Sequence, residues 1–266
     1  MPAVELSPQL KALPAPIKLQ MLERLKTKPS AVANQSTEQA WRSIARPEQI
    51  APEGDWRVWL IQAGRGFGKT RTGAEWVREQ VEAGKKRIAI VGPTAADCRD
   101  VMVEGESGLL AVCNPRPLYE PSKRRITWAN GALATTYSAD EPERLRGPQH
   151  DCGWADEIGA WKYATEAWDM LMFGLRLGND PKMVVTTTPR PIAIIRDLLK
   201  SPTTHITRGR TLDNAANLAP QFIDQIIAKY QGTRLGRQEI DGELLEDVEG
   251  ALWSRAMILY QALAEA

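Results

Sequence analysis

The segment Ala63–Thr70, with the sequence AGRGFGKT, constrains the fold of this chain more than any other feature. It follows an apolar stretch, Trp56–Gln62, that is predicted to be a β-strand, and it leads into Thr70–Glu82, where apolar residues recur at helical spacing. Glycines let the backbone wrap tightly, so that its amides point inward at anionic oxygens, and the helix N-terminus adds partial positive charge. A strand, a glycine-rich turn and a helix in this order predict a phosphate-binding loop.

The residues of this loop have expected roles in binding a nucleoside triphosphate. Lys69 would reach the β- and γ-phosphates, and the Thr70 hydroxyl would be a ligand of Mg²⁺. Ala63 replaces the first glycine of the usual pattern, and Arg65, which is unusual here, either faces the γ-phosphate or points to solvent. The alternative is a glycine-rich turn with an incidental lysine. The expected nucleotide contacts are Ala63, Gly64, Arg65, Gly66, Phe67, Gly68, Lys69 and Thr70.

Two adjacent acids, Asp156 and Glu157, follow a short predicted strand, Asp151–Ala155. In phosphoryl transfer, an Asp at such a strand end commonly holds Mg²⁺. Glu157 is then suited to polarise the attacking water as a general base. Two surface acids at the start of a helix are the alternative. No other Asp-Glu pair closes a predicted strand after the loop, so we expect Asp156 to bind metal and Glu157 to be catalytic.

Arg144 and Arg146 lie in a predicted loop, Glu143–Gly147. Phosphoryl transfer needs positive charge at the γ-phosphate, and a planar guanidinium supplied from a neighbour is a common source. Arg146 is the first candidate for this catalytic role and Arg144 the second. A solvated charged loop is the alternative.

Three threonines, Thr186, Thr187 and Thr188, lie where the predicted strand Met183–Thr187 ends. Their hydroxyls could sense the γ-phosphate and couple its loss to the rest of the protein. Threonine is also an ordinary strand residue, which is the alternative explanation.

The rest of the chain favours an α/β fold. Predicted strands at Arg87–Val91 and His205–Arg208 are separated by helical segments, and Asn130-Gly131 predicts a hairpin turn. Strands that alternate with helices favour a mostly parallel sheet with helices on both faces. We therefore expect a P-loop NTPase fold of the ASCE type with a small helical C-terminal subdomain.

Three parts are expected along the chain. Residues 1–55 would form an N-terminal arm with helices at Leu19–Lys28 and Thr37–Arg46, and residues 56–212 would form the P-loop core. Residues 213–266 would form the helical subdomain, with helices at Pro220–Tyr230 and Arg234–Glu246.

Composition excludes several classes of protein. The hydrophobic fraction of 43% and charged fraction of 25% are those of a globular protein, and the net charge of +1 neither shows nor excludes nucleic-acid binding. The three cysteines and two histidines lack zinc-ligand spacing. No apolar run approaches the roughly 20 residues that cross a bilayer, and no signal peptide is apparent, so a cytosolic protein with no membrane partner is expected.

Taken together, these segments resemble the ATPase domain of the large terminase subunit of tailed bacteriophages. The resemblance rests on four segments in order, followed by a fifth near the end of the chain: Ala63–Trp76, Ile90–Asp97, Ser138–Glu157, Val184–Pro191 and Arg237–Trp253.

The resemblance implies an ATP- and Mg²⁺-dependent motor that moves double-stranded viral DNA into a procapsid. Such motors form homo-oligomeric rings on the portal protein, with a small terminase subunit as a further partner, in the cytoplasm of the infected bacterial host. It assigns the nucleotide, metal, catalytic, finger and coupling roles to the residues described above. Gln49 falls where the family has an adenine-contacting segment. Full-length members also carry a C-terminal nuclease domain, and because this chain ends at Ala266, no DNA cleavage is expected.

Two other functions remain open. A P-loop helicase uses the same loop lysine and Asp-Glu pair, but helicases carry a second RecA-like domain. The roughly 110 residues after Glu157 leave no room for such a domain. A non-hydrolysing, nucleotide-gated scaffold would not need Glu157. Basic clusters at Lys85–Arg87 and Lys123–Arg125 are candidates for contact with DNA phosphates, although solvated charge is the commoner explanation.

Overall fold

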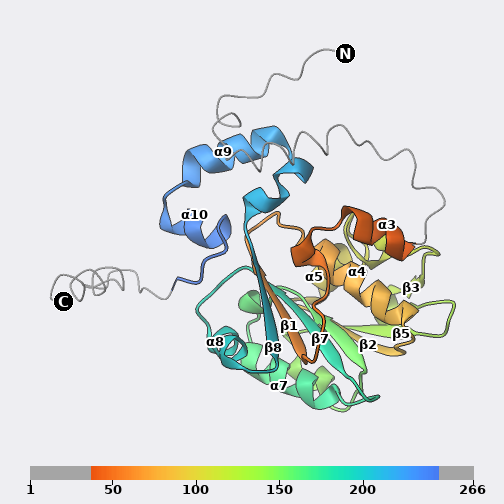
Figure 1. Cartoon of the computed structure of the whole chain (residues 1–266). Helices are drawn as coiled ribbons and strands as arrows, with labels where there is room; N and C mark the ends of the chain where they lie inside the picture. The colour runs from red at the N-terminus through yellow and green to blue at the C-terminus, as the bar shows by residue number, and fades with distance from the viewer. Residues whose placement is uncertain (1–36, 246–266) are drawn as a thin grey trace, which may run out of the picture.

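The centre of the structure is one eight-stranded sheet, seen in Figure 1, in a computed structural model that describes residues 37–245. The strand order is β3-β4-β5-β2-β6-β7-β1-β8. The strands from β5 to β8 in this order run parallel, whereas β3 and β4 are antiparallel additions at the edge next to β5. The strands are β1 (Val58–Ala63), β2 (Arg87–Gly92), β3 (Leu118–Glu120), β4 (Arg125–Thr127), β5 (Leu133–Ser138), β6 (Cys152–Ala155), β7 (Lys182–Thr187) and β8 (Thr204–Gly209).

Helices cover both faces of this sheet. In Figure 1, α4 (Lys69–Glu82) lies on one face, with α3 (Thr37–Ile44) beyond it, and α7 (Ala164–Gly174) and α8 (Ala193–Lys200) lie on the other. The α4 face also carries α5 (Ala95–Asp97), which continues as a π-helix at Cys98–Val103, and α6 (Leu109–Val112). The fold class predicted from the sequence, an α/β P-loop NTPase with a mostly parallel sheet, is confirmed.

Strand β1 shows why the sheet is buried on both sides. Successive side chains of a strand point to opposite faces, so Trp59 and Ile61 pack into the core beneath α4, whereas Val58 and Leu60 pack with α7 and α8. All six residues of β1 are buried, as expected for a strand with a parallel neighbour on each side and helices on both faces. The strand that ends at Ala63 is thus fixed from both faces.

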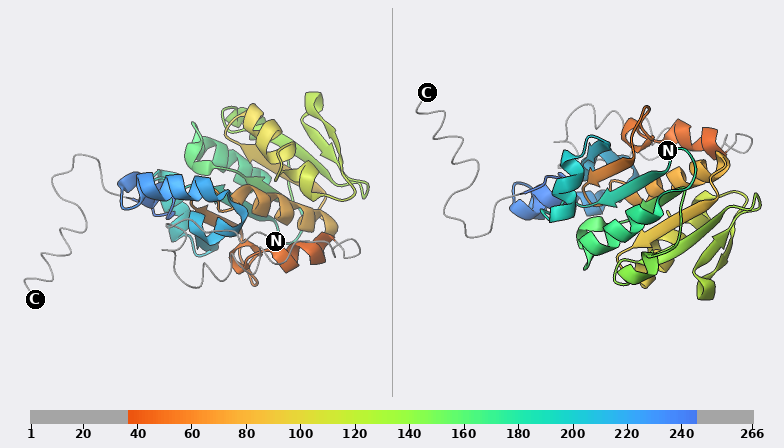
Figure 2. Two further views of the ribbon diagram at one scale, coloured as in Figure 1. Left: turned by 90° about the horizontal axis from the view of Figure 1, so that it is seen from above. Right: turned by 90° about the horizontal axis from the view of Figure 1, so that it is seen from below.

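The helical C-terminal segment lies beside the β8 edge of the sheet, away from β3 and β4, as Figure 2 shows. It contains a 3₁₀ helix, η6 (Thr211–Asn217), then α9 (Pro220–Tyr230) and α10 (Arg234–Glu239). Among residues 37–245, no helix combines the length and apolar character needed to cross a membrane.

One predicted helix differs from the structure at its end, one observed strand was not predicted, and one predicted helix is not tested. The helix predicted at Arg234–Glu246 is wrong at its C-terminal end, because α10 ends at Glu239. The backbone carbonyls of Glu239 and Ile240 accept hydrogen bonds from the amides of Arg65 and Thr211, so the chain leaves the helix there. The short edge strand β3 was not predicted. The helix predicted at Leu19–Lys28 lies outside the described residues.

Candidate functional site

The predicted loop and the predicted acids meet at one edge of the sheet. Ala63 ends β1, Ala155 ends β6 and Thr187 ends β7, and β7 lies between the other two strands. Because these strands are parallel, their carboxyl ends lie at the same edge, where ligands bind in many α/β folds. Residues far apart in the sequence therefore become neighbours.

The loop between β1 and α4 has the backbone of an anion-binding turn. Gly66 and Gly68 have φ angles of 75° and 100°, in the left-handed region that glycine adopts at little cost. Within residues 37–245, the backbone N–H groups of Gly66, Gly68, Lys69 and Thr70 have no hydrogen-bond acceptor. Free amides gathered at a helix N-terminus form a site suited to phosphate oxygens.

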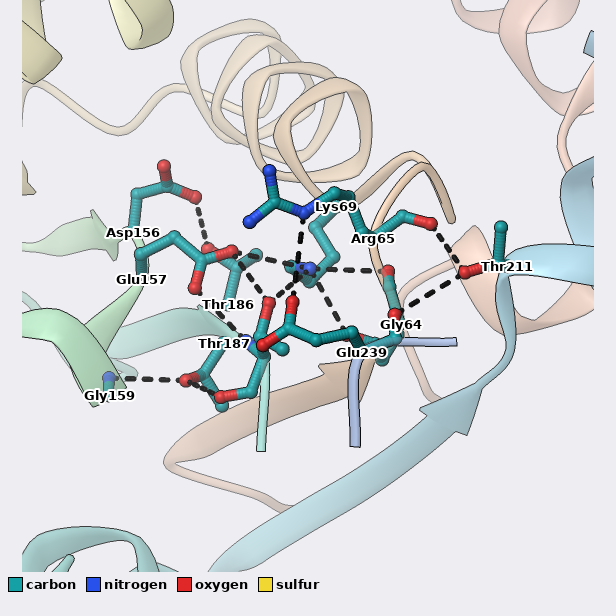
Figure 3. Close-up of polar contacts among 12 residues, drawn as sticks. Gly64, Arg65, Lys69, Asp156, Glu157, Gly159, Thr186, Thr187, Thr211 and Glu239 are labelled. Atoms are coloured by element: carbon teal, nitrogen blue, oxygen red, sulfur yellow. Dashed lines mark hydrogen bonds and ion pairs between the residues drawn. The ribbon is translucent and has the colours of Figure 1, made fainter. Parts of the chain in front are cut away.

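Lys69 is buried at the centre of a polar network, drawn in Figure 3. Its Nζ atom donates to the carbonyls of Ala63 at 3.1 Å and Gly64 at 3.3 Å, and to the Thr188 hydroxyl at 3.1 Å. The same nitrogen lies 3.3 Å from a carboxylate oxygen of Glu157. The lysine of the loop and one of the two predicted acids are thus in direct contact.

Asp156 is a buried carboxyl group that directly follows β6. The Thr186 hydroxyl donates a hydrogen bond to it, and the Trp161 indole N–H donates to its backbone carbonyl at 2.9 Å. Burial raises the pKa of Asp156 to about 7, and the negative charge of Glu157 adds to this rise. A cation at this carboxylate would offset the cost of its ionised form.

Glu157 occupies a strained backbone position, with φ 46° and ψ 49° in the left-handed region. Such a conformation is uncommon for a residue other than glycine, and it is held only where the surroundings enforce it. Its carboxylate accepts hydrogen bonds from the Thr188 amide at 3.0 Å and the Thr188 hydroxyl at 3.3 Å. Those contacts, with Lys69, fix the carboxylate beside the loop.

The three threonines link the acids to their surroundings. Thr186 bonds Asp156, and Thr188 bonds both Glu157 and Lys69. Thr187 accepts from the Gly159 amide at 3.1 Å and so holds the turn that follows the acids. Each threonine that was predicted to couple the site to the protein therefore contacts an acid or the turn after it.

A cavity of roughly 710 Å³ lies beside the loop. Gln49 lines it, and the Gln49 amide donates to the Thr72 hydroxyl at 3.1 Å. The cavity wall also includes loop and helix residues: Gly66, Gly68, Lys69, Thr70 and Arg71. It is large enough for a nucleoside next to the free amides.

Arg65 projects from the loop, with 75% of its side chain exposed. Its Nε atom lies 3.6 Å from a carboxylate oxygen of Glu239, which is in α10. Figure 3 shows this pair close to Lys69. The side chain of Arg65 therefore reaches the helical C-terminal segment.

The two candidate finger arginines lie apart from this network. Arg144 lies in the 3₁₀ helix η4 (Pro142–Leu145), which comes after β5, and Arg146 directly follows that helix. The side chain of Arg144 is 58% exposed and that of Arg146 is 68% exposed. Their ion-pair partners are Glu141 and Glu143. Neither arginine contacts Lys69 or the acids in the described part of the chain.

Sequence reasoning missed three residues that contact the loop, Arg46, Thr211 and Asn214. Nothing in their local sequence indicates this contact, because they lie well before or long after the loop in the chain.

The two basic clusters that were candidates for contact with DNA have partners within the chain. Lys85 and Lys86 donate hydrogen bonds to backbone carbonyls, and Lys123 forms an ion pair with Glu120.

Comparison with known families supports one family. A profile described as "Terminase large subunit, T4likevirus-type, N-terminal" matches residues 60–259. The matched range contains the loop from Ala63, the acids and the three threonines.

Solved structures of phage proteins share the fold. The large terminase ATPase domain of Thermus phage P74-26 is 14% identical, with a TM-score of 0.57 over 85% of this chain and 98% of that one. The large terminase of another thermophilic bacteriophage, solved in complex with ADP, is 15% identical with a TM-score of 0.57. The large terminase of bacteriophage HK97 is 12% identical with a TM-score of 0.51. A search of curated proteins found no match.

The chain spans about half of the length of two of these proteins. It covers 52% of the ADP-bound large terminase and 47% of the HK97 chain, compared with 79% and 71% of its own length. At identities of this level, the structural likeness establishes a shared fold.

Proposed function

This chain belongs to the T4likevirus-type family of large terminase subunits, and from this premise we propose that it hydrolyses ATP to drive double-stranded viral DNA into a procapsid. Residues 56–212 would be the ATPase core, residues 1–55 an N-terminal arm and residues 213–266 a helical lid. One observation carries the proposal. The loop with its free amides lies in direct contact, through Lys69, with the acid Glu157.

The residues of the site fit a nucleoside triphosphate. The free amides of Gly66, Gly68, Lys69 and Thr70 and the Lys69 ammonium would hold its phosphates, because both are donors gathered at one edge of the sheet. Gln49, at the wall of the adjacent cavity, would contact the base. The large terminase of the thermophilic bacteriophage compared above has been solved with ADP and with ATP-γ-S, which supports nucleotide as the ligand of this fold.

Asp156 and Thr70 would hold Mg²⁺ in this site. In the described residues, no group of three or more His, Cys, Asp or Glu side chains is arranged as a metal cage. Two protein oxygens, completed by phosphate oxygens and water, suit Mg²⁺ better than such a cage. The metal would neutralise charge on the transferring phosphoryl group. The buried Asp156, whose pKa is raised, would be ionised next to the metal.

Glu157 would act as the general base. Its carboxylate is fixed by Thr188 and Lys69, and because the side chain is one-third exposed, the carboxylate would accept a proton from a water molecule at the phosphate. Lys69 would move from Glu157 toward the phosphates when the substrate binds, which frees that carboxylate. The threonine contacts would then transmit the change from the acids to β7.

The finger and the partners follow from the same proposal. Arg146, with Arg144 second, would supply positive charge to the site of a neighbouring copy, since neither arginine contacts the site of its own chain among residues 37–245. A homo-oligomeric ring would bring the copies together, with double-stranded DNA, a portal protein and a small terminase subunit as partners. The site of action would be the cytoplasm of the infected bacterial host.

A hydrolysis assay with one matched pair of variants tests this function. Lys69→Ala removes a buried ammonium with four contacts, whereas Lys200→Ala removes an exposed lysine at the end of α8. We expect ATP turnover in the wild type and in Lys200→Ala, stimulated by double-stranded DNA, and a loss of about 10³-fold in Lys69→Ala. Equal turnover in both variants would reject the site.

A further inference from the structure

Three consecutive carbonyls of the loop are bonded by side chains from outside it. The Thr211 hydroxyl donates to the Arg65 carbonyl at 2.6 Å, and the Asn214 amide donates to the Gly66 carbonyl at 2.7 Å. The Arg46 guanidinium donates to the Phe67 carbonyl. We call these three side chains (Arg46, Thr211 and Asn214) the loop clasp.

The loop clasp is a connected and buried unit. Arg46, Thr211 and Asn214 are 4%, 1% and 9% exposed, and the Arg46 guanidinium also donates to the Asn214 side-chain oxygen. The same guanidinium lies 4.6 Å from the centre of the Phe67 ring. Arg46 and Asn214 are 168 residues apart in the chain, so the clasp joins the segment before β1 to the segment after β8.

Because the peptide bond is planar, a contact that fixes the direction of a carbonyl also fixes the direction of the next residue's N–H group. In a trans peptide, the C=O of one residue and the N–H of the next point in opposite directions. When Thr211 holds the Arg65 carbonyl outward, the Gly66 N–H must point the other way. When Arg46 holds the Phe67 carbonyl outward, the same is true of the Gly68 N–H.

Both amides that are oriented in this way are among those that have no acceptor within residues 37–245. Gly66 and Gly68 are also the two loop residues with positive φ, where the backbone has most freedom to turn a peptide over. A loop with flexible glycines needs an external restraint to keep its donors aimed at one point. The clasp supplies that restraint at the positions that need it.

We propose that Thr211 and Arg46, whose guanidinium is held in place by Asn214, are positioning residues that preorganise the Gly66 and Gly68 amides for the phosphates of the substrate. The inference rests on the proposed nucleotide site and assigns it three residues that act through the loop backbone. Preorganised donors bind an anion without the cost of ordering the loop. Loss of a clasp bond therefore weakens phosphate binding more than it weakens the fold.

The test measures binding of two probes, ADP and inorganic tripolyphosphate, by titration calorimetry. Thr211→Val removes the hydroxyl and keeps the shape, Thr211→Ser restores the hydroxyl, and Thr203→Val is a matched control at an exposed hydroxyl in the turn before β8. We expect Thr211→Val to raise the Kd of both probes by about five- to tenfold, the effect of one lost hydrogen bond. Thr211→Ser and Thr203→Val should stay within about twofold of the wild type.

A second variant keeps the test decisive if Thr211→Val does not fold. Asn214→Ala removes the acceptor that holds the Arg46 guanidinium and the donor to the Gly66 carbonyl, so tripolyphosphate binding should weaken by about tenfold. Thermal unfolding of each variant, measured in the same buffer, separates a loss of fold from a loss of affinity.

The outcomes distinguish the two proposals. If the wild type binds neither probe, the nucleotide site itself is wrong. If the wild type binds both, and the folded clasp variants bind them equally well, the clasp does not position the loop and only this inference is overturned. Weak binding in Thr211→Val with recovery in Thr211→Ser supports it.

Discussion

Two regions of the molecule carry the predicted catalytic groups, and they differ in how they are held. At the ends of β1, β6 and β7, Lys69 and Asp156 are buried and Glu157 is bonded by two neighbours. After β5, Arg144 and Arg146 are mostly exposed and pair with glutamates on their own 3₁₀ turn or next to it. Lys69 and the acids thus contact one another or shared neighbours, whereas among the described residues the two arginines make no contact with this group.

This difference indicates which groups act within a chain and which act between chains. Removing one partner from a buried charge pair costs several kcal/mol, because the other charge is left buried without a partner. An exposed ion pair contributes about 0–1 kcal/mol, so Arg146 can leave Glu143 at little cost. The loop and the acids are therefore fixed groups, whereas the arginines can readily turn toward another molecule.

The largest effect is expected from the fixed region. Glu157→Gln removes the carboxylate and keeps the size, so turnover should fall by about 10³-fold while ADP affinity changes little. The matched change Glu143→Gln, in the exposed region, should leave turnover within about threefold. Steady-state ATPase assays and ADP titrations measure both. Equal losses in the two variants would erase the distinction between the regions.

The next effect tests whether the arginines act between chains. Arg146→Ala should lower turnover by about 100-fold at protein concentrations at which the chains assemble. Mixing Arg146→Ala with Glu157→Gln should restore part of the activity, because an intact Glu157 then meets an intact Arg146 from its neighbour. Arg144→Ala, assayed in parallel, tells which arginine is needed. A mixture with no more activity than either variant would place the arginine's role within one chain or exclude it.

His150, just before the strand that precedes the acids, should affect stability. It is buried against Tyr137, and burial lowers its pKa to about 4. His150 takes up a proton below about pH 6.5 in the unfolded chain, but only near pH 4 in the folded chain. The neutral, buried histidine therefore contributes to the free energy of unfolding above pH 6.5, and this contribution is lost as the pH falls. Between pH 7 and pH 5 this amounts to about 2 kcal/mol.

The comparison of two histidine variants isolates this contribution. Because the raised pKa of Asp156 acts in the opposite direction, the prediction concerns the difference between wild type and His150→Gln. That difference in the free energy of unfolding should shrink by about 2 kcal/mol from pH 7 to pH 5. His205→Gln, on the exposed edge strand β8, should show no such change. Urea unfolding at several pH values measures both.

The smallest effect concerns the hydrogen bond from Thr186 to Asp156. This bond lowers the pKa of Asp156 and so opposes the effect of burial. Thr186→Val should raise the pKa of the metal-free Asp156 carboxyl further, by about one pH unit, as measured by NMR titration of that carboxyl without Mg²⁺. Thr186→Ser should restore the wild-type pKa. An unchanged pKa in Thr186→Val would mean that the Thr186 hydroxyl does not stabilise the ionised carboxylate.

The parts of the site that were predictable are those encoded locally. Ala63–Thr70 lies between a strand and a helix, so its turn could be recognised from a short stretch of sequence. The pairing of that turn with Asp156 and Glu157 followed from topology, because parallel strands bring their carboxyl ends to one edge. Belonging to the large terminase family was also predicted correctly, since several separate segments carried the resemblance.

The parts that were not predictable depend on contacts between distant segments. The loop clasp joins Arg46 to Asn214, and no local pattern in either segment marks a residue that bonds a carbonyl elsewhere. The end of α10 depends on backbone carbonyls bonding Arg65 and Thr211, whereas helix propensity alone continues the helix to Glu246. The left-handed conformation of Glu157 likewise reflects its surroundings and not its residue type.

A crystal structure of the wild-type chain with Mg²⁺ and ATP-γ-S would show directly where the phosphates bind. We expect the β- and γ-phosphates within hydrogen-bond distance of the amides of Gly66, Gly68, Lys69 and Thr70 and of Lys69 Nζ, with Asp156 and Glu157 on the other side of the γ-phosphate. Nucleotide bound away from this edge of the sheet, or phosphates held by residues other than these, would contradict this expectation.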